Sequence, residues 1–159
     1  PLMWELLRRF SKLDWEARVL FLRAAALLPL ISVSLRTRGF RSTQLSLQKL
    51  LPSISSKAAD SLPSAVDARV ELTARMVRSA AYRSFREATC LEKSLALWWL
   101  LSRQGIAANV RIGARKSNEK FEAHAWVECN GRSLNEPEER HRHYVAFDET
   151  FPLLDQAKK

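Results

Sequence analysis

The chain has 159 residues, of which 47% are apolar, and this is enough for one domain with a substantial core. Its formal net charge of +9 permits nucleic acid, an anionic membrane or an acidic peptide as a partner and does not choose among them. The basic residues are scattered, and no helix-turn-helix or aromatic-rich pattern joins them, so we expect no nucleic-acid binding. The two cysteines and the lack of a convincing targeting signal predict a cytoplasmic protein.

The segment from Asp14 to about Arg36 is strongly apolar and predicts a core helix that bends at Pro29. Its longest uncharged stretch, residues 24–35, is shorter than the about 20 residues that a membrane span needs. The alternative is an exposed helix face that docks a partner protein or makes a peripheral membrane contact.

Two further helical segments are expected before the middle of the chain. Ser42 is placed to cap a short helix that ends near Leu50, and a Ser/Pro-rich connector follows at residues 51–64. A second long helix is expected from Ser64. Its apolar residues recur at helical spacing, at Val66, Val70, Ala74, Val77 and Ala81.

A third helix has a clear start signal. Thr89 is a favourable N-cap, and Glu92 three residues later completes a capping box, so Cys90 takes the first helical position. The helix dipole and the unpaired backbone N–H groups there favour a thiolate and can receive an oxyanion. An apolar run follows, and Gly105 is the expected stop. Cys90 is therefore the candidate nucleophile.

Beyond Gly105, we expect a strand at residues 107–113, a polar exposed loop at 114–120 and a second strand at 121–129. In this second strand His124 and Trp126 share one face with glutamates, and small apolar residues occupy the other. We expect the His124 face to meet the layer that carries Cys90, with Trp126 forming a wall of a substrate site. Cys129 lies on the apolar face and is interpreted as a buried, inert thiol.

Asn130-Gly131 is a strong signal for a two-residue hairpin turn. That turn would pair Cys129 with Arg132, Trp126 with Asn135, and His124 with Pro137. Asn135 then lies on the face of His124 and Glu136 on the other, and a bulge would exchange the two. The group that orients the imidazole is therefore either Asn135 or Glu136.

The C-terminal part is expected to contain a solvated loop at residues 136–143, a last strand at 144–147 and a tail. His141 and His143 have no cysteine or carboxylate at a convincing ligand spacing, so we expect no metal site. Helices before residue 105 and strands after it predict an α+β fold, with a helical N-terminal part packed on a small antiparallel sheet.

Several motifs agree in order and spacing with one family. They are Cys90-Leu-x-x-Ser-Leu-Ala, Ile112-Gly113, Phe121-x-Ala-His-Ala-Trp-Val-Glu and Gly131-x-x-Leu-Asn-Glu. Together they resemble the standalone transglutaminase-like leader peptidase of lasso-peptide biosynthesis. In that family the triad is Cys, His and Asp, and this chain has Glu136 at the Asp position. The resemblance implies Cys90, His124 and Glu136 as the triad, because a glutamate can also hold an imidazole.

The resemblance also implies an architecture and partners. Residues 1–159 would form one domain, with 1–63 as a helical lead-in and connector and 64–159 as a transglutaminase-like or papain-like cysteine protease core. The substrate would be a ribosomal precursor peptide, cut between leader and core without a cofactor. A separate leader-recognition protein would deliver this peptide, and a separate ATP-dependent lasso cyclase would use the product.

Two other functions remain open from the sequence. A transglutaminase-like acyl transferase would use the same residues and hand the acyl group to an amine. A noncatalytic module for peptide binding or membrane docking would use the basic surface and the apolar helix around residues 19–35.

Overall fold

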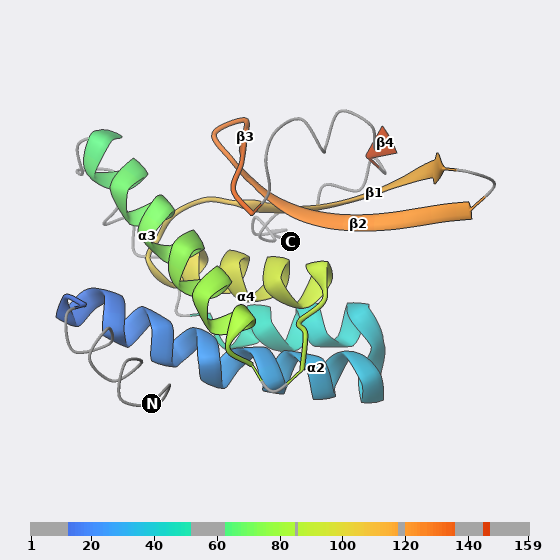
Figure 1. Cartoon of the computed structure of the whole chain (residues 1–159), viewed down its shortest axis with the longest axis horizontal. Coiled ribbons are helices and arrows are strands. Elements are labelled where there is room, and N and C mark those ends of the chain that lie inside the picture. Colours follow the sequence, from blue (N-terminus) through green and yellow to red (C-terminus); the bar gives the residue numbers. More distant parts are fainter. Residues whose placement is uncertain (1–12, 52–62, 85, 118–119, 136–144, 147–159) are drawn as a thin grey trace, which may run out of the picture.

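A computed structural model of the chain describes residues 13–51, 63–84, 86–117, 120–135 and 145–146. Three helices come first: α2 (Trp15–Lys49), α3 (Pro63–Tyr82) and α4 (Cys90–Arg103). The strands are β1 (Asn109–Ser117), β2 (Lys120–Cys129), β3 (Arg132–Ser133) and β4 (Val145–Ala146), in an antiparallel sheet of order β3-β2-β1-β4. Figure 1 shows the helices as a layer on one side of this sheet. The predicted α+β class is therefore confirmed.

Helix α2 has two arms that meet at Gly39, whose φ of 75° and ψ of 178° interrupt the helix. The arms fold back on each other (Figure 1), and the hydroxyl groups of Ser34 and Thr43 join them at 2.9 Å. The helix continues through Pro29, so the interruption of α2 lies at Gly39, and a bend of the axis at Pro29 stays a prediction. Pro29 and Ala25 are both exposed, so water can reach the carbonyl that the proline leaves unpaired. The helix expected from Ser42 is the second arm.

Helix α4 lies between the other helices and the sheet, and it contacts α2, α3 and β2. Most of its apolar residues are fully buried because neighbours cover them on several sides, and Leu91 and Trp99 are partly buried. One continuous core includes side chains from all three helices and two strands: Leu28, Ile31, Val77, Leu95, Trp98, Leu101, Val110 and Val127. This packing fixes the axis of α4, and with it the position of its first residue.

The two long strands form a ribbon whose register runs from Asn109↔Glu128 to Ser117↔Lys120. The polar loop predicted at residues 114–120 is therefore wrong over most of its length. An ion pair between Arg115 and Glu122 at 2.6 Å joins the strands where the loop was expected. Figure 1 shows this end of the ribbon extending beyond the helices. A ribbon without a covering layer needs no apolar alternation, which is why the sequence there resembles a loop.

The predicted two-residue turn is confirmed. Asn130 and Gly131 both have positive φ, at 51° and 75°, as a type I′ turn requires. The predicted pair Cys129↔Arg132 forms, and Glu128↔Ser133 follows it. The ladder of β3 ends at Ser133, before Asn135.

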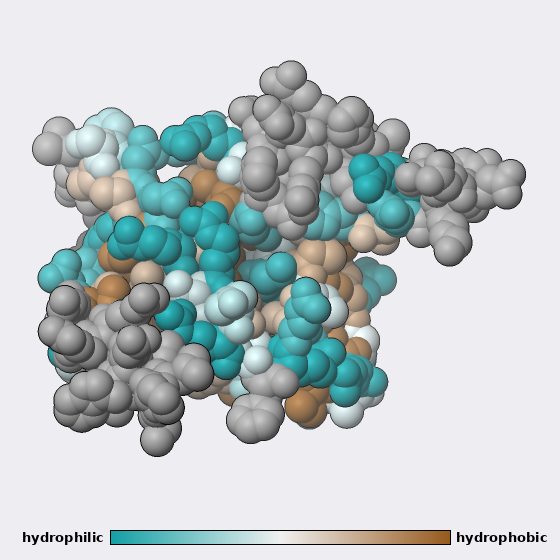
Figure 2. Space-filling view, viewed as in Figure 1, coloured by the Kyte–Doolittle hydropathy of each residue, from teal (hydrophilic) through white to brown (hydrophobic). Residues whose placement is uncertain are grey.

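By length and composition alone, α2 is apolar enough to cross a membrane. Its most apolar 18-residue window has a mean hydropathy of 1.8, and 28% of this window is buried within the fold. Core helices of water-soluble domains also pass this test. In α2 one face contributes to the core, and the opposite face is exposed. On the side of the molecule shown in Figure 2, apolar residues form separate patches between hydrophilic ones.

Candidate active site

The site begins at the first turn of α4, where the capping-box prediction is confirmed. Thr89 is the N-cap in an extended conformation, and its hydroxyl accepts a hydrogen bond from the Glu92 backbone N–H at 3.2 Å. The Glu92 carboxylate accepts one from the Thr89 N–H at 2.8 Å. Cys90 is therefore the first helical residue, and its thiol is half-buried and not in a disulfide.

The capping box leaves the next two amides available. Within the part of the chain that the structure describes, the backbone N–H groups of Cys90 and Leu91 donate no hydrogen bond. Such groups at a helix N-terminus carry the positive end of the helix dipole. They are suited to stabilise an oxyanion formed by attack of the neighbouring thiol.

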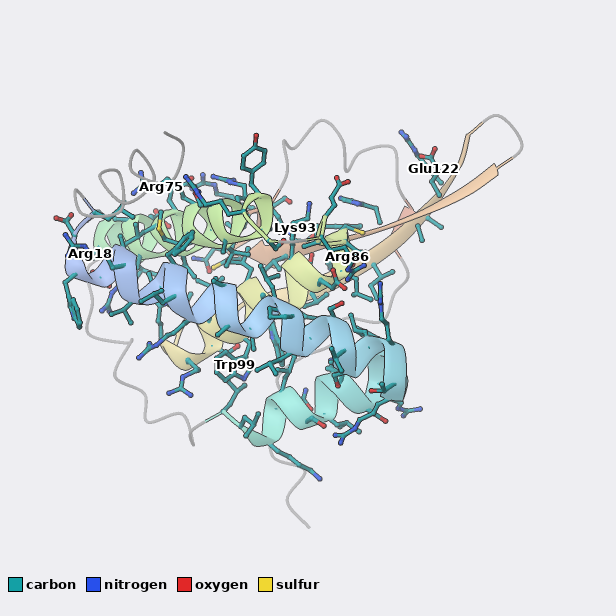
Figure 3. The ribbon with its side chains drawn as sticks, turned by 60° about the horizontal axis from the view of Figure 1, so that its bottom comes forward. Arg18, Arg75, Arg86, Lys93, Trp99 and Glu122 are labelled. Carbon is teal, nitrogen blue, oxygen red and sulfur yellow. The ribbon has the colours of Figure 1, made fainter. Side chains whose placement is uncertain are left out.

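Glu92 also connects this turn to α2. Its carboxylate is buried and accepts a hydrogen bond from the Arg86 guanidinium at 2.7 Å, and Arg86 also donates to the Ser32 hydroxyl. Burial alone would raise the pKa of Glu92, but hydrogen bonds from Thr89, Ser32 and Arg86 and the charge of Arg86 together lower it. Figure 3 shows Arg86 and Lys93 at this end of α4. The charge beside Cys90 is thus compensated.

His124 lies on β2, where it pairs with Gly113 of β1. Gly113 in turn pairs with Ala146 of β4, so His124, Gly113 and Ala146 lie in one row across three neighbouring strands. The imidazole stacks on the Trp126 ring, with centroids 6.2 Å apart. Trp126 is buried and donates from Nε1 to the Glu128 carboxylate at 3.0 Å. The predicted proximity of Trp126 and His124 on one face is therefore present.

The structure places Cys90 and His124 on two packed elements, α4 and β2. Val127 and Cys129 of β2 belong to the same core as Leu95 of α4, so the small apolar face of β2 meets the helices. His124 belongs to the alternate face of the strand. Burial of apolar surface explains why this face of β2 packs on the helices, and the predicted meeting of His124 with Cys90 stays a prediction.

Asn135 joins the sheet to the nucleophile helix. Its side-chain oxygen accepts from the Val127 backbone N–H at 2.9 Å, and its side-chain nitrogen donates to the Ser94 hydroxyl at 2.7 Å. Ser94 is one turn after Cys90 on α4. Asn135 therefore points toward α4 instead of pairing with Trp126 and sharing the face of His124. Sequence reasoning missed this bridge, although a serine inside an apolar helix was a signal for a buried polar contact.

The remaining predicted residues divide into two groups. Cys129 is buried as predicted and donates to the Ala107 carbonyl at 3.3 Å. Burial raises the pKa of its thiol, the charge of Asp67 raises it further, and Arg132 opposes them. Glu136, Pro137, His141 and His143 lie outside the described residues. Within the described part, no three His, Cys, Asp or Glu side chains are grouped to hold a metal ion.

A helical layer on an antiparallel sheet, with a cysteine at the capped start of a buried helix, is the arrangement of a cysteine-nucleophile enzyme. A family profile described as "Transglutaminase-like superfamily" matches residues 31–147, which include α3, α4 and the sheet. The chain belongs to the transglutaminase-like superfamily, which generally contains enzymes of the cysteine-protease or acyltransferase type. No curated protein and no solved structure matches the chain significantly.

Proposed function

We propose that this chain is a cysteine peptidase that removes the leader from a ribosomal precursor peptide during lasso-peptide maturation. The observation that carries the proposal is Cys90 itself: a half-buried thiol at the first position of a capped, buried helix, within a transglutaminase-like domain. The lasso substrate rests on the motif resemblance around Cys90, His124 and Glu136. The same resemblance supports the proposed delivery protein and the downstream ATP-dependent cyclase, and the lack of a convincing targeting signal supports a cytoplasmic location.

The proposed reaction has two steps. In the first, the Cys90 sulfur attacks the scissile carbonyl, and the backbone N–H groups of Cys90 and Leu91 stabilise the oxyanion. His124 takes the thiol proton and gives it to the leaving amine, so a thioester and a free N-terminus form. In the second, water attacks the thioester, His124 accepts its proton, and the thiol is regenerated.

The role of the third residue is assigned to Glu136. Both ends of the Asn135 amide already have partners, the Val127 backbone N–H and the Ser94 hydroxyl. Glu136 has the position that the family gives to its acidic residue and can accept a hydrogen bond from the imidazole. The proposal also requires the imidazole to lie within reach of the thiol when substrate binds.

The test is mass spectrometry of a candidate precursor after incubation with the chain, with and without its delivery protein. We expect leader and core fragments with the wild-type chain and none with Cys90→Ala or His124→Ala. Cys129→Ala is the matched control, because it removes the other thiol and should leave cleavage intact. Cleavage by the Cys90→Ala variant would remove this residue from the mechanism and with it the proposal.

The superfamily also contains acyl transferases, and the same assay separates the two reactions. A hydrolase adds water to the new C-terminus of the leader, whereas an acyl transferase adds an amine supplied in the mixture. An amine adduct as the main product would assign the chain to the second activity.

A further inference from the structure

Helix α2 exposes several large apolar side chains on one of its faces. Leu22, Leu30 and Val33 are 56%, 66% and 61% exposed. With Ala26 and Pro29 they form one exposed strip, which we call the α2 strip, at spacings of three and four residues. Contiguous patches of exposed apolar residues are typical of interaction sites.

The α2 strip borders a groove of about 640 Å³. Pro29 and Val33 line one side, Phe21 contributes an aromatic ring, and the end of α3 with the segment before α4 forms the other side. The volume is in the range of sites that hold ligands, about 300–1,000 Å³. The groove is thus a concave apolar surface that continues onto an exposed apolar helix face.

The charged groups of the groove are mostly positive. Arg36, Arg83 and Arg86 line it, with Glu92 as the one carboxylate among the lining residues that the structure describes. Arg86 is paired with Glu92 at 2.7 Å, and the Arg83 guanidinium lies over the Phe21 ring at 5.8 Å. Arg36 and Arg83 form no ion pair with a carboxylate in the part of the chain that the structure describes, and an occupant with carboxylates would complement their charges.

The groove also reaches the nucleophile turn. Its lining includes Ala88 and Glu92, which lie two residues before and two residues after Cys90. A peptide held in the groove would therefore pass close to the tip of α4. Cys90 itself is not part of the lining, so the groove is a site beside the reacting thiol.

We propose that this groove binds a segment of the substrate peptide that carries apolar side chains and one or more carboxylates, away from the bond that is cut. Apolar side chains of the peptide pack on Phe21, Pro29 and Val33, and its carboxylates bind Arg36 and Arg83. The site rests on the proposed function, because it assigns the occupant as the peptide that Cys90 attacks.

The test measures binding to the full chain with Cys90→Ala, so that binding is separated from cleavage. The probe is a fluorescein-labelled peptide of about 15 residues, with leucine at every third or fourth position and glutamate between, and a counterpart with lysine for glutamate. We expect saturable fluorescence anisotropy with a Kd of about 10–100 µM for the glutamate peptide. The lysine peptide should bind at least about tenfold more weakly.

Variants locate the site. Val33→Glu should weaken binding of the glutamate peptide at least about tenfold, and Arg36→Glu should reverse the preference between the two peptides. Leu45→Glu is the matched control, because Leu45 is also exposed, at 45%, on the second arm of α2 and outside the groove. Circular dichroism checks that each variant is folded.

Three results would overturn the site: no saturable binding, equal binding of both peptides, or an equal loss with Leu45→Glu. Vesicles with and without anionic lipid form another arm. Vesicle binding that Val33→Glu abolishes, with no peptide preference, would assign the α2 strip to a membrane surface instead. Precursor cleavage by the wild-type chain, without groove binding by the Cys90→Ala chain, would refute the groove and leave the proposed peptidase standing.

Discussion

Replacing Arg86 with methionine tests how the nucleophile turn is held. The guanidinium that donates to the Glu92 carboxylate at 2.7 Å and to Ser32 is lost, and methionine keeps much of the apolar stem. Glu92 retains its hydrogen bond from the Thr89 N–H. The carboxylate, only 6% exposed, is then left without its ion-pair partner.

The magnitude follows from this burial. Removing one partner of a fully buried ion pair costs about 3–5 kcal/mol, but the Arg86 side chain is 46% exposed and water already screens part of the interaction. We therefore expect a loss of about 2 kcal/mol in the free energy of unfolding. For a chain of this size that corresponds to a fall in Tm of about 4–8 °C.

The loss should depend on pH. The pKa of Glu92 is lowered in the folded chain, so its ionised form stabilises the fold above the unfolded pKa, and this stabilisation disappears as the pH falls through the folded pKa. A protonated Glu92 no longer needs the guanidinium. The difference in Tm between wild type and Arg86→Met should therefore be full at neutral pH and shrink in acid.

The assay is thermal unfolding followed by circular dichroism at neutral and acidic pH. Arg69→Met is the control, because Arg69 and Glu16 form a surface pair with both side chains 53% exposed and should contribute less than about 1 kcal/mol. Adding Glu92→Gln to Arg86→Met should restore stability, since glutamine keeps the capping box without a charge. An equal Tm for the two arginine variants, or no rescue by glutamine, would refute the reasoning.

Three further predictions concern the same region. Iodoacetamide should alkylate Cys90 faster than the buried Cys129 in the folded chain, and peptide mapping can measure both rates. In denaturant the two cysteines should react at similar rates. Equal rates in the folded chain would favour a noncatalytic module. Asn135→Ala should cost about 1–3 kcal/mol in urea unfolding, and adding Ser94→Ala should cost little more, because the two residues share one hydrogen bond; additive losses would contradict the bridge. Thr89→Ala should lower stability by about 1 kcal/mol while Thr89→Ser should not, and equal losses would argue against the cap.

Features set by neighbouring residues were predictable from the sequence. The capped start of α4 depends on Thr89 and Glu92, and the turn depends on Asn130 and Gly131, all within a few residues of what they determine. The end of α4 is equally local: Gly105 has a φ of 74°, and Ile106 N–H donates to the Leu101 carbonyl in a Schellman motif.

Features set by distant neighbours were not predictable. The alternation of β2 separates His124 from Val127, but it does not say which face the helices cover. The bridge from Asn135 to Ser94 joins residues 41 positions apart, and only the packing of β2 on α4 brings them together. The break of α2 at Gly39 was not predicted, although its φ of 75° suits glycine.

The break at Gly39 decides where the second arm of α2 packs. The second arm of α2 returns to its own core, where the Leu47 carbonyl accepts a hydrogen bond from Trp99 Nε1 at 3.0 Å. Any other residue at position 39 would be strained at this positive φ. The strain would favour a continuous helix over the folded-back conformation. A straightened α2 would carry Leu47 away from Trp99. Glycine at this position thus lets the second arm pack on the core of its own chain.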